Sequence, residues 1–428
     1  MDDSWHFTLF FKTQKNEVPM KSSKKKVTVL KQICNLIPGH LVRNLAKKHE
    51  VDKQARAFSP WSHIVSLFFA QLSHALSLND VCDTLGNHEG ALKDIRGAVP
   101  PKRNTFSNAN RKRNADMAEA LFWEMHDHLS KLSPGFGIGR KYSGVPRRFK
   151  KVINAIDSTT IKLFANCMNW AKHRRRKAAA KMHLSLNLQS FLPRFIIVEP
   201  AKGHDATKAM SLCSNLQSGE IVVFDKAYIK FNFLHDLTER GVFWVGRAKD
   251  NMVYETVGQH AVPKGNVKRD DRIKLTGVKP SKDYPDELRL VEADVEIDGK
   301  MVHMVFITNN FEWAASSITD LYKARWGIEV FFKEIKQNLK LADFLGYNEE
   351  AVRWQVWTAM TVYILLRFIE HTSKWTHSSF NRLFTVLRGV IWSYIDMWEL
   401  LKSYGTASGT IRIGAQPDQA WLPGLVPQ

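Results

Sequence analysis

Two aspartates have the type and context that metal-dependent phosphodiester chemistry needs. Asp157 closes the apolar, strand-like run 152–156, and Asp225 closes the run 221–224. A carboxylate at the carboxyl end of a buried strand lies where α/β sheets hold ligands, and it is costly there unless it is paired or bound to metal. Each aspartate alone fits a turn or a helix cap better than a metal site. Two such positions in one sheet favour a shared site.

A third acid, Glu329, lies in a segment with helical spacing. Tyr322, Arg325 and Lys336 lie seven, four and seven residues from Glu329, so a helix places all four on one stripe. An apolar stripe beside it consists of Ile328, Phe331, Phe332 and Ile335. We expect Glu329 to bind metal, and Arg325 and Lys336 to bind phosphate oxygens. A solvated face with ordinary ion pairs is the alternative.

In-line attack on a phosphodiester needs an activated oxygen and a stabilised leaving oxygen, which two hard metal ions roughly 3.5–4 Å apart supply. Mg²⁺ prefers oxygen ligands and keeps several waters, so a few carboxylates and the substrate phosphate suffice. We therefore expect Mg²⁺ at Asp157, Asp225 and Glu329, and Mn²⁺ can substitute. No His or Cys cluster is visible at metal-ligand spacing.

The composition favours a nucleic-acid partner. The chain of 428 residues has a formal net charge of +20, and the simplest partner for so basic a chain is a polyanion. A generic basic protein is the alternative. The four cysteines form no zinc-knuckle spacing and suit a reducing cytoplasm. No apolar run reaches the roughly 20 residues of a bilayer span, so we expect a cytoplasmic protein. Met20 is an alternative start to Met1.

The residue pattern divides the chain into four successive segments. A helical stretch is followed by a Gly-, Pro- and Lys/Arg-rich segment, then by strands with helices between them, and finally by helices. A single helix is expected over about 316–340. The predicted organisation is a basic tail (1–27), a helical DNA-binding domain (28–132), a linker (133–151), an α/β core (152–248 and 302–345), a β-rich insertion (249–301) and C-terminal helices with a tail (346–428).

These residues resemble a known family. The spacing of Tyr322, Arg325, Glu329 and Lys336 is similar to the signature of the insertion-sequence-four family of DDE transposases, and the segments 155–160 and 223–228 resemble its two Asp motifs. The resemblance runs from about 30 to 370. One departure is Ala227, where the family suggests Gly, and another is Ala178. An alanine in a turn that needs positive φ is strained.

The resemblance implies a ribonuclease-H-like mixed-sheet core with the β-rich insertion between the second Asp and the Glu. It also implies Mg²⁺-dependent cut-and-paste transposition. Asp157, Asp225 and Glu329 become the catalytic metal ligands. Tyr322, Arg325 and Lys336 become contacts to transposon-end DNA.

Further DNA contacts are expected on basic segments. The segment 102–113 resembles a basic helix following a helix at 78–85, and its Arg111 and Arg113 can reach bases or phosphates. A second basic run contains Arg174 and Arg175 and suits backbone phosphate. Lys181 lies in a segment that also resembles the family. A helical domain with a solvated basic face is the alternative.

The prediction is a DNA transposase of an insertion sequence that binds double-stranded terminal inverted repeats and target DNA. Because two ends must be paired, we expect a homodimer in the assembled complex. The rivals are a transposase-derived DNA-binding regulator without catalysis and a metal-dependent nuclease of the same fold.

Overall fold

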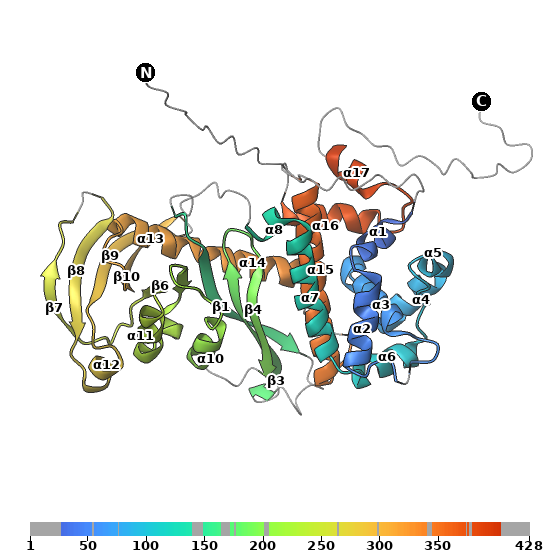
Figure 1. The fold of residues 1–428 in the computed structure, drawn as a ribbon, viewed down its shortest axis with the longest axis horizontal. Helices are drawn as coiled ribbons and strands as arrows, with labels where there is room; N and C mark the ends of the chain where they lie inside the picture. The colour runs from blue at the N-terminus through green and yellow to red at the C-terminus, as the bar shows by residue number, and fades with distance from the viewer. Residues whose placement is uncertain are drawn as a thin grey trace, which may run out of the picture.

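The computed structural model describes residues 27–53, 55–75, 77–138, 149–163, 172–174, 177–200, 205–262, 265–297, 299–339, 345–373, 375 and 379–403. Three parts follow one another along the long axis of the molecule (Figure 1). A helical body lies at one end, a mixed sheet with helices on its faces lies in the middle, and a β-rich insertion lies at the other end. The candidate site lies in the middle part.

The helical body is built from both ends of the chain. Its first helices are α1 Val29–Asn35, α2 Gly39–Lys48, α3 Pro60–Ser73, α4 Leu78–Asn87, α5 Glu89–Lys93, α6 Arg103–Lys112, α7 Asp116–Leu132 and α8 Pro134–Ile138. Its last helices are α15 Glu349–Thr372, α16 Phe380–Gly389 and α17 Met397–Ser403. The 24-residue α15 packs against α3, α6 and α7, and all share one hydrophobic core. The segments predicted as separate N- and C-terminal regions therefore fold against each other.

The central sheet contains β1 Ile153–Leu163, β2 Lys172–Arg174, β3 Lys177–Asn187, β4 Pro193–Pro200, β5 Ile221–Phe224 and β6 Phe243–Arg247. Its main order is β4-β3-β1-β5-β6, in which β4, β3 and β1 are antiparallel and β1, β5 and β6 are parallel. This is a ribonuclease-H-like arrangement, so the predicted fold class is confirmed. Helices α10 Asp205–Leu212 and α11 Phe231–Glu239 pack on one face of the sheet.

The insertion continues the same sheet. Its elements are β7 Tyr254–Gln259, β8 Val267–Leu275, α12 Val278–Asp283, β9 Leu288–Ile297 and β10 Lys300–Thr308. Strand β10 pairs antiparallel with β6, so that β10, β9, β8 and β7 extend one ten-stranded sheet. A buried pair, Arg289 with Asp270 at 2.7 and 2.8 Å, lies between β8 and β9. The β-rich insertion of the predicted fold class is confirmed.

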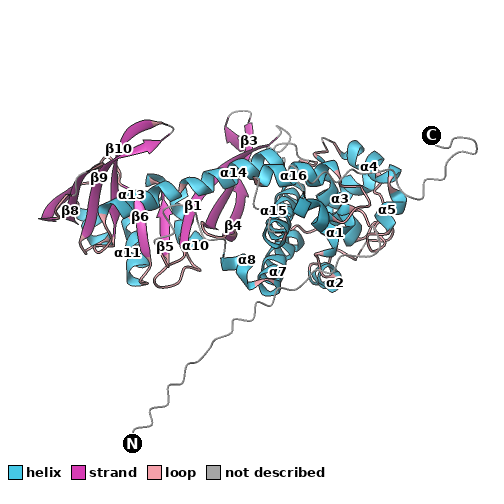
Figure 2. Ribbon diagram, turned by 90° about the horizontal axis from the view of Figure 1, so that it is seen from above, coloured by secondary structure: helices cyan, strands magenta, loops and turns pink. Residues whose placement is uncertain are grey.

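Two helices follow the insertion where one was expected. Helix α13 Ala315–Ala324 ends at Arg325, and α14 Trp326–Asn338 begins after it. Arg325 itself keeps a right-handed helical backbone (φ −51, ψ −32), and its N–H bonds to the carbonyl of Tyr322, three residues back. The expectation of a single helix over 316–340 is therefore wrong, because one tight turn interrupts the α-helical hydrogen bonds at Arg325. Both helices run along the upper face of the sheet toward the helical body (Figures 1 and 2).

The first residues of the predicted linker are helical. Residues 134–138 form α8, and Phe136 packs edge-on against Phe368 of α15 with ring centroids 5.3 Å apart. Residues 139–148 and the predicted tails, up to 26 and from 404, lie outside the described residues. In the described part of the chain, no helix is both long enough and apolar enough to cross a membrane.

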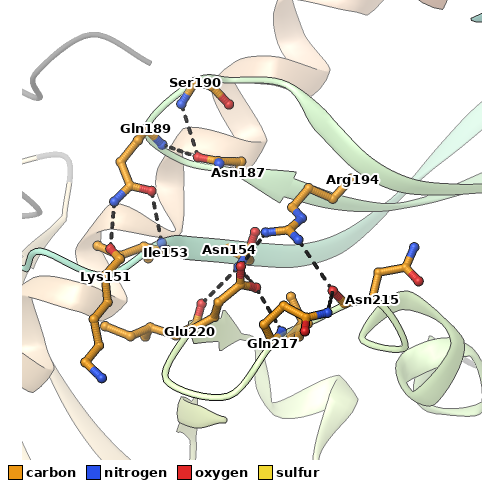
Figure 3. A network of polar contacts seen from close by, with 12 residues as sticks. Lys151, Ile153, Asn154, Asn187, Gln189, Ser190, Arg194, Asn215, Gln217 and Glu220 are labelled. Carbon is orange, nitrogen blue, oxygen red and sulfur yellow. Dashed lines mark hydrogen bonds and ion pairs between the residues drawn. The ribbon is translucent and has the colours of Figure 1, made fainter. Parts of the chain in front are cut away.

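A polar network fixes the amino ends of β1 and β5 (Figure 3). Glu220, just before β5, accepts hydrogen bonds from Arg194 of β4 at 2.7 Å and from Asn154 of β1 at 3.3 Å. The side-chain oxygen of Gln189 accepts a hydrogen bond from the Ile153 N–H at 3.0 Å. These contacts hold three strands in register at the end of the sheet opposite the candidate site.

Candidate active site

Strand register brings Asp157 and Asp225 to neighbouring positions. Strands β1 and β5 are parallel, and Ile156 pairs with Phe224. The residue that follows each of these is an aspartate, Asp157 in β1 and Asp225 after β5. Because side chains alternate along an extended chain, both aspartates point to the face opposite Ile156 and Phe224. The prediction that Asp157 closes its strand is wrong, because β1 continues to Leu163 beside β3. Only the pairing of β1 with β5 ends here, after the pair Ile156 and Phe224.

One guanidinium joins two of the predicted acids. Arg325 donates from Nη1 to Oδ2 of Asp157 at 3.0 Å and from Nη2 to Oε1 of Glu329 at 2.6 Å. The Tyr322 hydroxyl donates to Oδ1 of Asp225 at 3.3 Å. The three acids, from β1, from the end of β5 and from α14, therefore meet around two residues of the signature stripe. This convergence was expected for the acids, but the bridging position of Arg325 was not.

Burial shapes the electrostatics of the site. It raises the pKa of Asp157 to about 6, and the nearby Glu329 and Asp225 add to this rise, whereas the Ser158 N–H and Arg325 oppose it. Burial also raises the pKa of Tyr322 to about 12, so its hydroxyl stays protonated and serves as a donor. A buried carboxyl beside two others is stabilised by a cation. In this structure the guanidinium of Arg325 supplies that charge.

The carboxylates are not closed into a tight three-ligand cage. Among the described residues, only His235, Glu239 and Asp286 bring three candidate ligand atoms within 4.8 Å of one another. Arg325 lies between Asp157 and Glu329, and its Nε–H is buried without a hydrogen-bond partner in the described part of the chain. The site is therefore open at the edge of the sheet. It is lined by the carboxylate oxygens of the three acids and by Arg325, which keeps one N–H available.

A third strand adds a residue that the sequence reasoning did not assign to the site. Strand β6 is parallel to β5, and Phe224 pairs with Gly246, so Arg247 lies next to Asp225. The half-buried Arg247 is near enough to oppose the rise in the pKa of Tyr322. A basic residue two positions after the apolar run 242–245 was the available signal. Lys336, the last residue of the signature stripe, is exposed two turns beyond Glu329 on α14.

The predicted DNA contacts outside the site differ in environment. Arg111 of α6 is exposed and bonds to Asn108 at 3.0 Å. Arg113 instead donates to the carbonyls of Phe58 and Ser59, in the loop before α3. Burial lowers the pKa of Arg113 to about 10. An arginine held by main-chain carbonyls in this way supports the loop.

The other predicted contacts lie near β3. Lys181 of β3 is half-buried and in register with Thr160 on one side and Glu199 on the other. Arg174 ends the short strand β2, and Arg175 lies outside the described residues. The role of these three residues in DNA binding stays a prediction.

The alanine expected to strain the second Asp motif does not do so. Ala227 lies in the short 3-10 helix Lys226–Tyr228 that Asp225 caps, and it is not among the described residues with positive φ. A short 3-10 turn has negative φ and accepts any residue with a Cβ.

Similarity to known proteins agrees with this geometry. Residues 148–365, about half of the chain, match the family described as transposase DDE domain. The chain belongs to the transposase DDE domain family. The family prediction made from the sequence is thereby confirmed. Residues 25–95 of this DDE-domain protein match a second family, described as a domain of unknown function.

Individual relatives carry transposase names. The chain is 33% identical over 54% of its length to y4zB of Sinorhizobium fredii, assigned as a transposase, and covers 64% of that protein. It is 29% identical over 56% of its length to the protein of Geobacillus stearothermophilus assigned as the transposase of insertion sequence element IS5377, of which it covers 63%. The chain thus spans slightly less than two thirds of these relatives.

Among solved structures, the piggyBac transposase synaptic complex with hairpin DNA aligns with 89% of this chain and 82% of that chain. The TM-score is 0.45 and the sequence identity 8%, an overlap too loose to support an argument about the fold.

Proposed function

We propose that this protein is the DNA transposase of an insertion sequence, a metal-dependent polynucleotidyl transferase that cleaves transposon ends and joins them to target DNA. The observation that carries the proposal is the bridge of Arg325 between Asp157 and Glu329, with Asp225 beside them. Arg325 and Tyr322 together contact acids from β1, from the end of β5 and from α14, which supports a shared site at the edge of a ribonuclease-H-like sheet. The names of the relatives support the same activity.

The donor set suits Mg²⁺, with Mn²⁺ as a substitute. Asp157, Asp225 and Glu329 offer only hard carboxylate oxygens. Burial raises the pKa of Asp157, and the nearby Glu329 and Asp225 add to this rise. Bound between these acids and the DNA phosphate, two such ions would activate the attacking oxygen and stabilise the leaving oxygen. All three acids are partly accessible, as open ligand positions require.

The basic residues of the site have a separate task. Arg325 has a donor that no described residue uses, Arg247 lies next to Asp225, and Lys336 is exposed on the same helix as Glu329. Guanidinium groups bind phosphate oxygens with paired hydrogen bonds. We assign these three residues to the DNA backbone at the cleaved end. The hydroxyl of Tyr322 keeps the Asp225 carboxylate oriented.

Substrate and assembly follow from the reaction class. The net charge of +20 suits long contacts with double-stranded DNA, namely the terminal inverted repeats and the target. Joining two ends requires two active sites, so we propose a homodimer in the assembled complex. We propose that Arg111, on the exposed side of α6, contributes to recognition of the ends.

The test is cleavage of DNA that carries the element's own ends, in Mg²⁺, by the wild-type chain and the variant Glu329→Gln. We expect Glu329→Gln to lose at least about 100-fold in cleavage rate, because a metal that stabilises developing charge contributes several kcal/mol, while binding of the ends persists. Glu296→Gln, an exposed acid of β9, is the matched control and retains full activity. Equal cleavage by the wild type and Glu329→Gln would refute the active site.

The same assay separates the rivals. Cleavage without joining of supplied 3′-hydroxyl ends identifies a nuclease of this fold. End binding with neither cleavage nor joining identifies a DNA-binding regulator.

A further inference from the structure

A second group of metal-ligand side chains lies on the other face of the sheet. His235 and Glu239 are one turn apart on α11, and Asp286 lies between α12 and β9 in the insertion. Their nearest ligand atoms all lie within 4.8 Å of one another. Helix α11 packs in the hydrophobic cluster on the face opposite α13 and α14 (Figure 1), so this group is separate from the three catalytic acids.

The spacing of these atoms fits a shared ion better than it fits hydrogen bonds. Nε2 of His235 lies 3.4 Å from Oδ2 of Asp286 and 3.8 Å from Oε1 of Glu239. N–H···O hydrogen bonds span about 2.7–3.2 Å, so both distances are too long for one. Two ligands that each lie about 2.0–2.2 Å from a tetrahedral ion are roughly 3.3–3.5 Å apart. The three side chains need only small movements to reach that geometry.

The charge at this position is not balanced by nearby cations. In the described part of the chain, neither Glu239 nor Asp286 forms an ion pair with Lys or Arg. The adjacent Arg240 bonds instead to Asp236 at 3.1 Å, and Arg272 pairs with Glu287. Two carboxylates thus face one imidazole.

The surroundings of the group hold it in place. The ring of Tyr284 packs edge-on against His235, with centroids 5.5 Å apart, and its hydroxyl lies 3.0 Å from Oγ1 of Thr238 on α11. Tyr284 therefore orients both the histidine and the segment before Asp286.

A cavity beside the group carries a second unused imidazole nitrogen. The cavity has a volume of about 560 Å³, and its lining includes Asp286, Tyr284, Thr238 and His260. The Nε2 atom of His260 is buried and has no hydrogen-bond partner among the described residues. Buried polar atoms are rarely left unpaired. The unpaired nitrogen of His260 therefore indicates a missing polar ligand in the cavity beside the group.

We propose that His235, Glu239 and Asp286 bind one Zn²⁺ ion that fastens the insertion to the catalytic core. One nitrogen and two carboxylate oxygens, with water completing the tetrahedron, form a ligand set that Zn²⁺ accepts. Imidazole favours Zn²⁺ over Mg²⁺, which suits all-oxygen sites. Because α11 belongs to the core and Asp286 to the insertion, the ion adds a link between two parts of the chain that also meet through β10 and β6 and through Tyr284.

The test is zinc binding by the full chain after treatment with a chelator, in excess Mg²⁺ so that the three catalytic acids do not compete for zinc. We expect one Zn²⁺ per chain and a higher melting temperature with zinc than without. His235→Gln raises the Kd for Zn²⁺ by at least about 100-fold, since even changes outside the ligand shell cost about 10- to 100-fold. Asp286→Asn should also weaken zinc binding. Because the Asp286 side chain is 56% exposed, this substitution should not disturb the fold.

His303→Gln is the matched control. His303 also lies near two acids, Asp294 at 3.3 Å and Glu292 at 3.9 Å, but Lys268 and Arg269 already pair with them. This variant, and Glu329→Gln in the catalytic site, should bind zinc as the wild type does. The inference is overturned if His235→Gln and Asp286→Asn bind Zn²⁺ as tightly as the wild type, or if loss of zinc affinity occurs only in Glu329→Gln.

Discussion

The guanidinium of Arg325 lies 3.0 Å from the carboxylate of Asp157, although 168 positions separate the two residues in the chain. The same guanidinium bonds to Glu329, four residues further along the helix. The contact therefore ties the turn between α13 and α14 to the middle of β1. It also means that a cation of the protein itself lies where metal ions and DNA are proposed to bind.

Removal of this charge should separate metal binding from catalysis. In Arg325→Gln, the acids lose a competing cation, and we expect Mg²⁺ to bind about 3- to 10-fold more tightly, a modest effect because solvent screens charges near a protein surface. Cleavage should nevertheless fall about 10-fold or more, since a phosphate contact is lost. Calorimetric titration of Mg²⁺ and cleavage assays measure the two quantities. Weaker Mg²⁺ binding by the variant would show that Arg325 organises the acids rather than competing for them.

Gly246 leaves room for the strand end that carries Asp225. A Cβ at this position would lie 2.5 Å from a ring carbon of the buried Phe224 and 2.9 Å from Ile229. We expect Gly246→Ala to destabilise the fold by about 1–3 kcal/mol, the usual cost of overpacking, and to lower cleavage by displacing Asp225. Urea unfolding and cleavage rates test this.

Gly90→Ala is the control for Gly246→Ala. Gly90 lies in α5, and a Cβ there meets nothing within 4 Å. This variant should be as stable as the wild type or more stable by up to about 1 kcal/mol, because alanine favours helix. Equal stability of Gly246→Ala and Gly90→Ala would contradict the packing argument.

Arg111 and Arg113 should have opposite phenotypes despite lying two residues apart. Arg111→Ala should change stability by less than about 0.5 kcal/mol, as exposed substitutions do, and should reduce the salt dependence of DNA binding by about one phosphate contact. Arg113→Ala should cost about 1–3 kcal/mol, because the carbonyls of Phe58 and Ser59 lose their donor. Thermal unfolding and binding at several salt concentrations distinguish them. A strong DNA defect in a stable Arg113→Ala protein would assign Arg113 to DNA instead.

His63 should make the helical body sensitive to acid. It is fully buried, and Nε2 lies 2.7 Å from the Asn110 side-chain oxygen. Burial lowers its pKa from 6.5 to about 3, and the charge of Arg113 adds to this effect. Because the unfolded chain binds the proton more readily, the stability due to neutral His63 is complete above pH 6.5. It is lost as the pH falls toward 3, by on the order of 4 kcal/mol.

The measurement is urea unfolding at several pH values from 4 to 7. His63→Gln should be less stable at pH 7 and should show a flatter dependence on pH. His303→Gln, on the exposed surface of the insertion, should keep the wild-type slope. A wild-type slope in His63→Gln would assign the acid sensitivity to other groups.

Local patterns in the sequence were sufficient for much of the catalytic core. The run 221–224 coincides with β5, and the apolar stripe of Ile328, Phe331, Phe332 and Ile335 is buried as predicted. These features depend on periodicity and on residues that are near one another in the chain. The end of β1 could not be predicted in the same way, because β3 extends the strand beyond Asp157 and lies far along the chain.

By itself, the sequence determined the mixed α/β core with its insertion and membership of the DDE family, and it predicted which three acids form the candidate site. Only the tertiary structure decided that Arg325 bridges Asp157 and Glu329, that Arg247 lies beside Asp225, that the two terminal helical regions share one core, and that Asp286 meets His235. The physical reason is that strand register and helix docking arise from contacts between distant segments, for which the local spacing of residues carries no signal.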